Sequence, residues 1–143
     1  MGNNIFLDIK KAEIRLPLDI LGGYMSQFNK AFDKNLIFET KGTFEKEEDS
    51  WAKIDLFEQT KETEEPKSVT RAYVVAPNLN NYRMLVLKIS YLRSKVYPCE
   101  LYNALIDKKF TCETSEKLDE VMVELFKSPE FKNPISILLS QIL

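Results

Sequence analysis

The spacing of apolar residues changes twice along the chain, and this change limits which folds the sequence can adopt more than any other feature. In several stretches between residues 36 and 112, apolar and polar residues alternate, which is the pattern of strands with one buried face. On both sides of this region, apolar residues recur at helical intervals. The order of helix, strands and helices favours a layered α+β fold.

The most regular alternation covers residues 82–92, which we expect to form a central strand. The pattern puts Leu85, Leu87, Ile89 and Tyr91 on one face, and Met84, Val86, Lys88 and Ser90 on the other. Further strands are predicted at residues 36–44, 51–57, 69–76, 96–105 and 108–112, with Pro98 favouring an edge or a bulge. We expect an antiparallel meander of about five strands.

Three segments have the spacing of amphipathic helices. The first follows Pro17 and ends near Asn35, and the second is centred on Val121, with Thr114 or Ser115 as its cap. Ser128-Pro129 and Asn133-Pro134 each predict a new helix start near the C-terminus. We therefore expect one N-terminal and two C-terminal helices to cover the sheet. Residues 5–16 fit either a helix or a strand, and both remain open.

The 143 residues form a single domain, long enough to bury a core without a disulfide or a structural metal. Cys99 and Cys112 are expected to be buried, reduced thiols. The sequence shows neither a secretory signal nor an apolar stretch long enough for a membrane span, so a cytoplasmic location without membrane association is expected.

Composition argues against most kinds of catalysis. The chain has no histidine, two cysteines and four glycines, which excludes Ser-His-Asp and Cys-His nucleophiles and the usual zinc sites. No glycine pattern indicates a phosphate-binding loop. We expect no cofactor and no metal, and a binding protein is favoured over an enzyme.

Opposite charges are separated along the chain. Residues 44–66 carry nine acidic and three basic side chains, whereas residues 67–112 carry eight basic and two acidic ones. The acidic block predicts loops that either are simply solvated or contact a partner protein. The residues proposed for that contact are Glu47, Glu48, Asp49, Glu62, Glu64 and Glu65.

The C-terminal segment after Pro134 is apolar on almost every side, which is unusual for a helix at the end of a chain. Such a helix either closes the core of its own domain or is covered by another chain, as in a homodimer. The residues predicted to make this contact are Ile135, Leu138, Leu139 and Ile142.

The basic block mixes cations with tyrosines, a combination that binds phosphates and stacks bases in single-stranded nucleic acids. The predicted residues are Arg83, Lys88, Arg93, Lys95 and Tyr97. Pairing of these strands with the acidic hairpin inside the same fold is the favoured alternative.

Asp19 together with Glu39-Thr40-Lys41 resembles the acid and E-x-K motif that restriction-endonuclease-type nucleases place around magnesium. The resemblance covers this short motif only. Asp19 also falls at the start of a predicted helix, where an acid is expected because of the helix dipole.

Taken together, these features predict a non-catalytic cytoplasmic binding or regulatory module. It would act on a protein partner by surface complementarity, as inhibitors, immunity proteins and adaptors do. A single-stranded nucleic-acid-binding protein is the first alternative, and a metal-dependent nuclease is the second.

Overall fold

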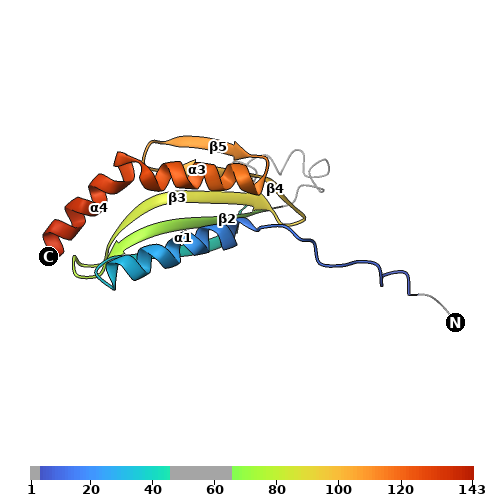
Figure 1. Cartoon of the computed structure of the whole chain (residues 1–143), viewed down its shortest axis with the longest axis horizontal. Helices are drawn as coiled ribbons and strands as arrows, with labels where there is room; N and C mark the ends of the chain where they lie inside the picture. The colour runs from blue at the N-terminus through green and yellow to red at the C-terminus, as the bar shows by residue number, and fades with distance from the viewer. Residues whose placement is uncertain (1–3, 46–65) are drawn as a thin grey trace, which may run out of the picture.

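A computed structural model describes residues 4–45 and 66–143 of the chain. The described residues form an α+β fold, as the order of the apolar patterns predicts (Figure 1). Its elements are α1 (Pro17–Phe32), β1 (Ile37–Glu45), β2 (Lys67–Ala76), β3 (Tyr82–Leu92), β4 (Lys95–Asn103), β5 (Lys108–Cys112), α3 (Ser115–Lys127) and α4 (Pro129–Ile142). The strand predicted at residues 51–57 lies outside the described residues.

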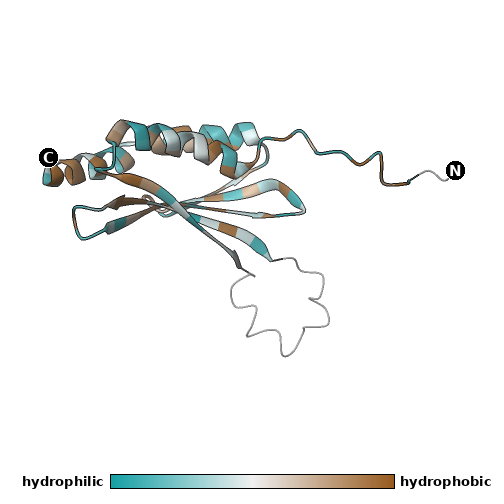
Figure 2. Cartoon of the chain, turned by 90° about the horizontal axis from the view of Figure 1, so that it is seen from below, coloured by the Kyte–Doolittle hydropathy of each residue, from teal (hydrophilic) through white to brown (hydrophobic). Residues whose placement is uncertain are grey.

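The five strands form one open antiparallel sheet in the order β1-β2-β3-β4-β5, which confirms the meander and the central position of β3. The helices lie on one face of this sheet, and no described helix covers the other face (Figures 1 and 2). We call these the inner and the outer face.

The inner face and the helices enclose the hydrophobic core. Four phenylalanines, one each from α1, β1, α3 and α4, join these elements: Phe28, Phe38, Phe126 and Phe131, with successive ring centroids 5.3, 5.8 and 5.2 Å apart. The strands contribute Phe38, Ala72, Val74, Ala76, Val86, Leu87, Ile89, Cys99, Leu101 and Cys112. Close packing of these side chains is the main stabilising contribution to the fold.

One part of the face assignment for β3 is wrong. The register of β3 on β2 shifts between Ala72 and Tyr73, so that Val86 is an extra residue on β3. Such a bulge changes which side chains share a face. Leu85, opposite Tyr73, therefore lies on the outer face, whereas Leu87, opposite Ala72, is fully buried on the inner face. Met84 and Val86, which the alternation places on the face opposite Leu87, also contribute to the inner-face core.

Pro98 lies in an irregular part of β4. The β3–β4 pairing shifts between Ser90 and Leu92, and β4 lies between β3 and β5 rather than at an edge of the sheet. Because proline has no N–H group for the ladder, it is tolerated where pairing is interrupted. Of the edge position and the bulge predicted for Pro98, the structure therefore shows an irregularity in strand pairing and not an edge position.

Helix α1 begins at Pro17 and ends at Phe32, three residues before the expected end. Asp33 and Lys34 both have positive φ angles, and Asp33 donates its backbone N–H to the carbonyl of Asn29. Two consecutive left-handed residues end the helix and turn the chain into β1.

The two C-terminal helices are capped as the sequence predicts, by Thr114 for α3 and Ser128 for α4. The further helix start at Pro134 is wrong, because Pro134 lies inside α4. It is the sixth residue of a helix that begins at Pro129, so it removes one backbone hydrogen bond near an end without preventing continuation. Residues 4–16 form neither a regular helix nor a strand, only a single turn at residues 5–8.

Candidate binding surfaces

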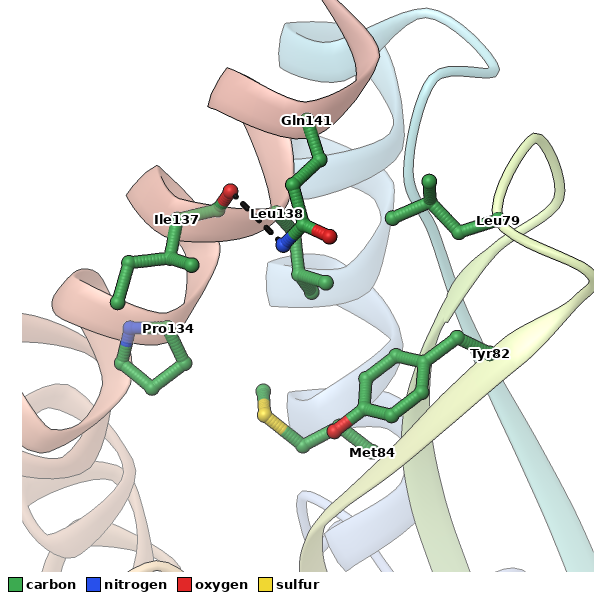
Figure 3. Close-up of a pocket in the computed structure, with 7 residues that line it drawn as sticks. All are labelled: Leu79, Tyr82, Met84, Pro134, Ile137, Leu138 and Gln141. Atoms are coloured by element: carbon green, nitrogen blue, oxygen red, sulfur yellow. Dashed lines mark hydrogen bonds between the residues drawn. The ribbon is translucent and has the colours of Figure 1, made fainter.

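An open apolar groove lies between α4 and the β2–β3 hairpin, with a volume of about 490 Å³ (Figure 3). We call it the α4 groove. The hairpin side and the helix side face one another across the gap. Its lining residues are Leu79, Tyr82, Met84, Pro134, Ile137, Leu138 and Gln141.

The groove leaves large apolar side chains in water. Tyr82 is 49% exposed and Ile137 is 59% exposed, on opposite walls. The groove exists because the helix and the hairpin diverge, while Leu138 and Met84 still pack on the core below. An exposed apolar surface of this kind is typical of a site that binds another apolar surface.

The predicted contact residues of the C-terminal helix have different environments. Ile135 and Leu138 are buried in the core, and Leu139 and Ile142 pack against it while partly exposed. Ile137 was absent from the prediction although it is the most exposed apolar residue in the groove. The helix thus closes the core of its own domain and still presents one apolar edge.

Cations and tyrosines are paired on the outer face of the sheet. The guanidinium of Arg83 lies 5.1 Å from the ring centroid of Tyr73, and the ammonium of Lys88 lies 5.8 Å from that of Tyr102. Both distances are within the range of cation–π attraction. Arg83 also forms an ion pair of 2.9 Å with Glu39, which partly neutralises this surface.

The five residues predicted to bind nucleic acid are not brought together. Arg83 and Lys88 lie on the outer face, whereas Arg93 and Lys95 are exposed at the β3–β4 hairpin. Tyr97 packs against the core, and burial raises its pKa to about 12. Of the five, only Arg83 and Lys88 share one candidate nucleic-acid-binding surface, the outer face of the sheet.

The acidic motif residues are also separated. Asp19 is in the first turn of α1, on the helical side of the sheet, and Glu39 contacts Arg83 on the outer face. In the ranges 4–45 and 66–143, no three histidine, cysteine, aspartate or glutamate side chains are grouped in a way that could hold a metal ion.

Six acidic residues predicted to contact a partner lie outside the described residues: Glu47, Glu48, Asp49, Glu62, Glu64 and Glu65.

The predicted basic block contains an ion pair between its own strands. Lys67 on β2 and Glu100 on β4 form this pair, with a distance of 3.8 Å.

A second apolar surface was missed by the sequence analysis. Residues 4–14, which we call the N-terminal arm, extend away from the fold and are exposed throughout (Figure 1). Ile5, Phe6, Leu7 and Ile9 are each 65% exposed or more. The clustering of apolar residues in this segment is visible in the sequence, but helical and strand spacing both implied that they would be buried.

The arm is attached at its base by polar contacts. Arg15 forms an ion pair of 3.3 Å with Asp119 on α3, and its carbonyl oxygen accepts a hydrogen bond from Tyr97. Asp119 also accepts a hydrogen bond from the Tyr24 hydroxyl, and this bond raises the pKa of Tyr24, with burial adding to the effect. These contacts fix where the arm leaves the fold.

Both cysteines are free, buried and directly opposite one another on β4 and β5. The neighbouring thiol of Cys112 and burial both raise the pKa of Cys99. This disfavours the reactive thiolate form at neutral pH.

Comparison of the chain with protein-family models, curated proteins and solved structures gives no significant match. Among the helices described, none combines the length and the apolar character needed to cross a membrane. The surfaces themselves are therefore the basis for a functional proposal.

Proposed function

We propose that the protein is a non-catalytic binding module that acts on a protein partner through the α4 groove. The observation that carries this proposal is the pair of exposed apolar walls, with Tyr82 on one side and Ile137 on the other. The absence of histidine from the whole chain adds support for binding rather than catalysis.

The shape and chemistry of the groove suit an apolar segment of a protein. An aromatic residue and aliphatic side chains line an open depression, and such pockets take anchoring side chains at protein interfaces. Gln141 is the polar residue among those that line it, and its amide donates to the carbonyl of Ile137. Binding would therefore depend mainly on apolar burial, with little demand for matched charges.

The acidic residues at positions 47–49 and 62–65 are a second contact in this proposal, toward a basic region of the partner. An inhibitor, an immunity protein or an adaptor works by this combination of an apolar anchor and complementary charge. A cytoplasmic location is also part of the proposal, because two free thiols that face one another on β4 and β5 suit a reducing compartment.

Selection of displayed random peptides on the purified protein tests the use of the groove. We expect the enriched peptides to contain apolar anchor residues and to bind at least about tenfold more weakly to Ile137→Asp, which loses about 1.4 kcal/mol or more of binding free energy. Ile106→Asp is the matched control, because Ile106 is exposed but does not line the groove. Peptides that bind all three proteins equally would contradict the proposal.

A second candidate function is the binding of single-stranded nucleic acid on the outer face. The favouring observation is the stacking of Arg83 on Tyr73 and of Lys88 on Tyr102, on a sheet face that no described helix covers. Cations beside aromatic rings on an open sheet can contact phosphates and bases together.

Titration of a labelled oligonucleotide of about 20 thymidines, at several salt concentrations, tests this candidate. If it is right, log Kd rises with log salt by about 0.7 per phosphate contact, and Arg83→Ala with Lys88→Ala reduces that slope. Lys132→Ala, on the exposed side of α4, is the control and leaves the slope unchanged. If the protein does not bind the oligonucleotide even at low salt, it is not a single-stranded nucleic-acid-binding protein.

A further inference from the structure

Residues 4–45 and 66–143 carry two apolar surfaces that no other described segment covers, and these surfaces lie at opposite ends of the molecule. The N-terminal arm carries Ile5, Phe6 and Leu7, which are 77, 65 and 74% exposed. The arm extends away from the fold at one end, whereas α4 and its groove lie at the other end (Figure 1). Two exposed apolar surfaces on a single chain are the conditions for association between copies.

The exposed residues of the arm are arranged compactly. The side chain of Asn4 accepts a hydrogen bond of 3.0 Å from the backbone N–H of Phe6, and the N–H of Leu7 donates to the carbonyl of Asn4. These contacts hold residues 5–8 in one turn. The turn therefore keeps Ile5, Phe6 and Leu7 close together along the far part of the arm, where all three side chains are exposed.

The arm of the same chain is poorly placed to reach its own groove. It is attached at Arg15, beside the first residue of α1, and α1 is about 24 Å long. Residues 4–14 span at most about 36–40 Å when fully extended. With residues 5–8 held in their turn, the six residues 9–14 span at most about 20–22 Å, which is shorter than α1. Folding back along the molecule would therefore have to open the turn at Asn4.

We infer that the α4 groove is occupied by the N-terminal arm of a second copy of this chain, with residues 5–9 inserted between α4 and the β2–β3 hairpin. The exchange is reciprocal, so that two arms fill two grooves around a two-fold axis. This inference rests on the proposed function of the groove as a protein-binding site and names its occupant. The groove volume of about 490 Å³ is in the range that encloses a small group of apolar side chains.

Light scattering coupled to size-exclusion chromatography, over a range of concentrations of the full chain, provides the test. We expect a dimer that becomes a monomer on dilution, and an apparent dissociation constant at least about tenfold higher for Phe6→Asp and for Ile137→Asp. Both side chains are more than half exposed in one copy, so the variants are expected to fold. Ile106→Asp controls for any exposed apolar residue and should dimerise as the wild type does.

Mixing the two defective variants gives a sharper result. The Ile137→Asp protein keeps a native arm, and the Phe6→Asp protein keeps a native groove, so the mixture can form one of the two contacts. We expect heterodimers in the mixture under conditions in which each variant alone is monomeric. Thermal unfolding of each variant, followed by circular dichroism, confirms that a monomer is folded.

The possible failures are distinguishable. A wild type that is monomeric at every concentration, or a dimer insensitive to both substitutions, overturns the inference about the arm. If selected peptides still bind the groove in that case, the proposed function stands with another protein as the partner. If they do not, both proposals are wrong.

Discussion

The hydroxyl group of Tyr97 on β4 donates a hydrogen bond of 2.6 Å to the backbone oxygen of Arg15, at the base of the N-terminal arm. Arg15 in turn pairs with Asp119 on α3. A single tyrosine therefore connects the sheet to the segment whose position decides where the arm leaves the fold.

Replacing Tyr97 with phenylalanine should change how stability depends on pH. Burial raises the pKa of Tyr97 from 10 to about 12, so the folded protein keeps this hydroxyl protonated where the unfolded chain ionises it. The associated stabilisation is complete below pH 10 and is lost as pH rises toward 12. In urea unfolding between pH 8 and 12, the free energy of unfolding should fall more steeply with pH for the wild type than for Tyr97→Phe.

At neutral pH the same variant should lose about 0.5–1.5 kcal/mol, the usual value of one hydrogen bond. Tyr82→Phe serves as the control for removal of a tyrosine hydroxyl elsewhere. Parallel pH profiles for the wild type and Tyr97→Phe would contradict the assigned role.

The side chain of Asn29 on α1 bonds both backbone groups of Phe38 on β1, with distances of 2.8 Å to the N–H and 3.2 Å to the carbonyl. Because β1 is the edge strand of the described sheet, these backbone groups face away from β2 and meet no other described strand. Asn29→Ala should destabilise the fold by about 1–3 kcal/mol in urea unfolding, since the bonds to two partly buried groups are lost. Asn78→Ala, at an exposed turn position, should cost less than about 0.5 kcal/mol.

Two isoleucines of α4 provide a matched comparison. Ile135 is 5% exposed and belongs to the core, whereas Ile137, two residues later, is 59% exposed and lines the groove. Ile135→Ala should lower the free energy of unfolding by about 2–5 kcal/mol. Ile137→Ala should lower it by less than about 1 kcal/mol, measured at a concentration at which the protein is monomeric. Equal losses would mean that α4 packs differently.

The cysteine pair should be unreactive in the folded protein. Cys99 and Cys112 are 1% and 0% exposed, and the raised pKa of Cys99 further reduces its thiolate fraction. We expect modification by an aromatic disulfide reagent to proceed at the rate at which the protein opens, and to become rapid in denaturant. Immediate reaction of either thiol in the native protein would show that the β4–β5 pairing opens readily.

The fold could be predicted to a large extent because each strand and helix has its own local pattern. Alternation located β3, and capping residues located the starts of α3 and α4. The face of Leu85 could not be predicted, because a bulge depends on the pairing of two strands rather than on either sequence. The helix start predicted at Pro134 was wrong because α4 already begins at Pro129. A proline so close to the beginning of a helix is tolerated inside it.

The candidate site was predicted less well than the fold. Leu138 was included as a contact, but Leu79, Tyr82 and Met84 come from a hairpin about 50 residues earlier in the chain, and only packing brings them beside α4. The exposure of the arm was not predictable either, since its apolar spacing suits a buried segment equally well. A surface that is formed by segments far apart in the chain cannot be predicted from the residue pattern of either segment alone.

Because neighbouring strands of the described sheet follow one another in chain order, they can pair in the order in which a ribosome produces them. Of the helices that cover the inner face, α3 and α4 follow all five described strands in the chain. A nascent chain that has reached β5 therefore presents Leu87, Ile89 and Leu101 to its surroundings until α3 and α4 have been made. During that interval these apolar strands are the kind of surface that aggregates or that chaperones hold.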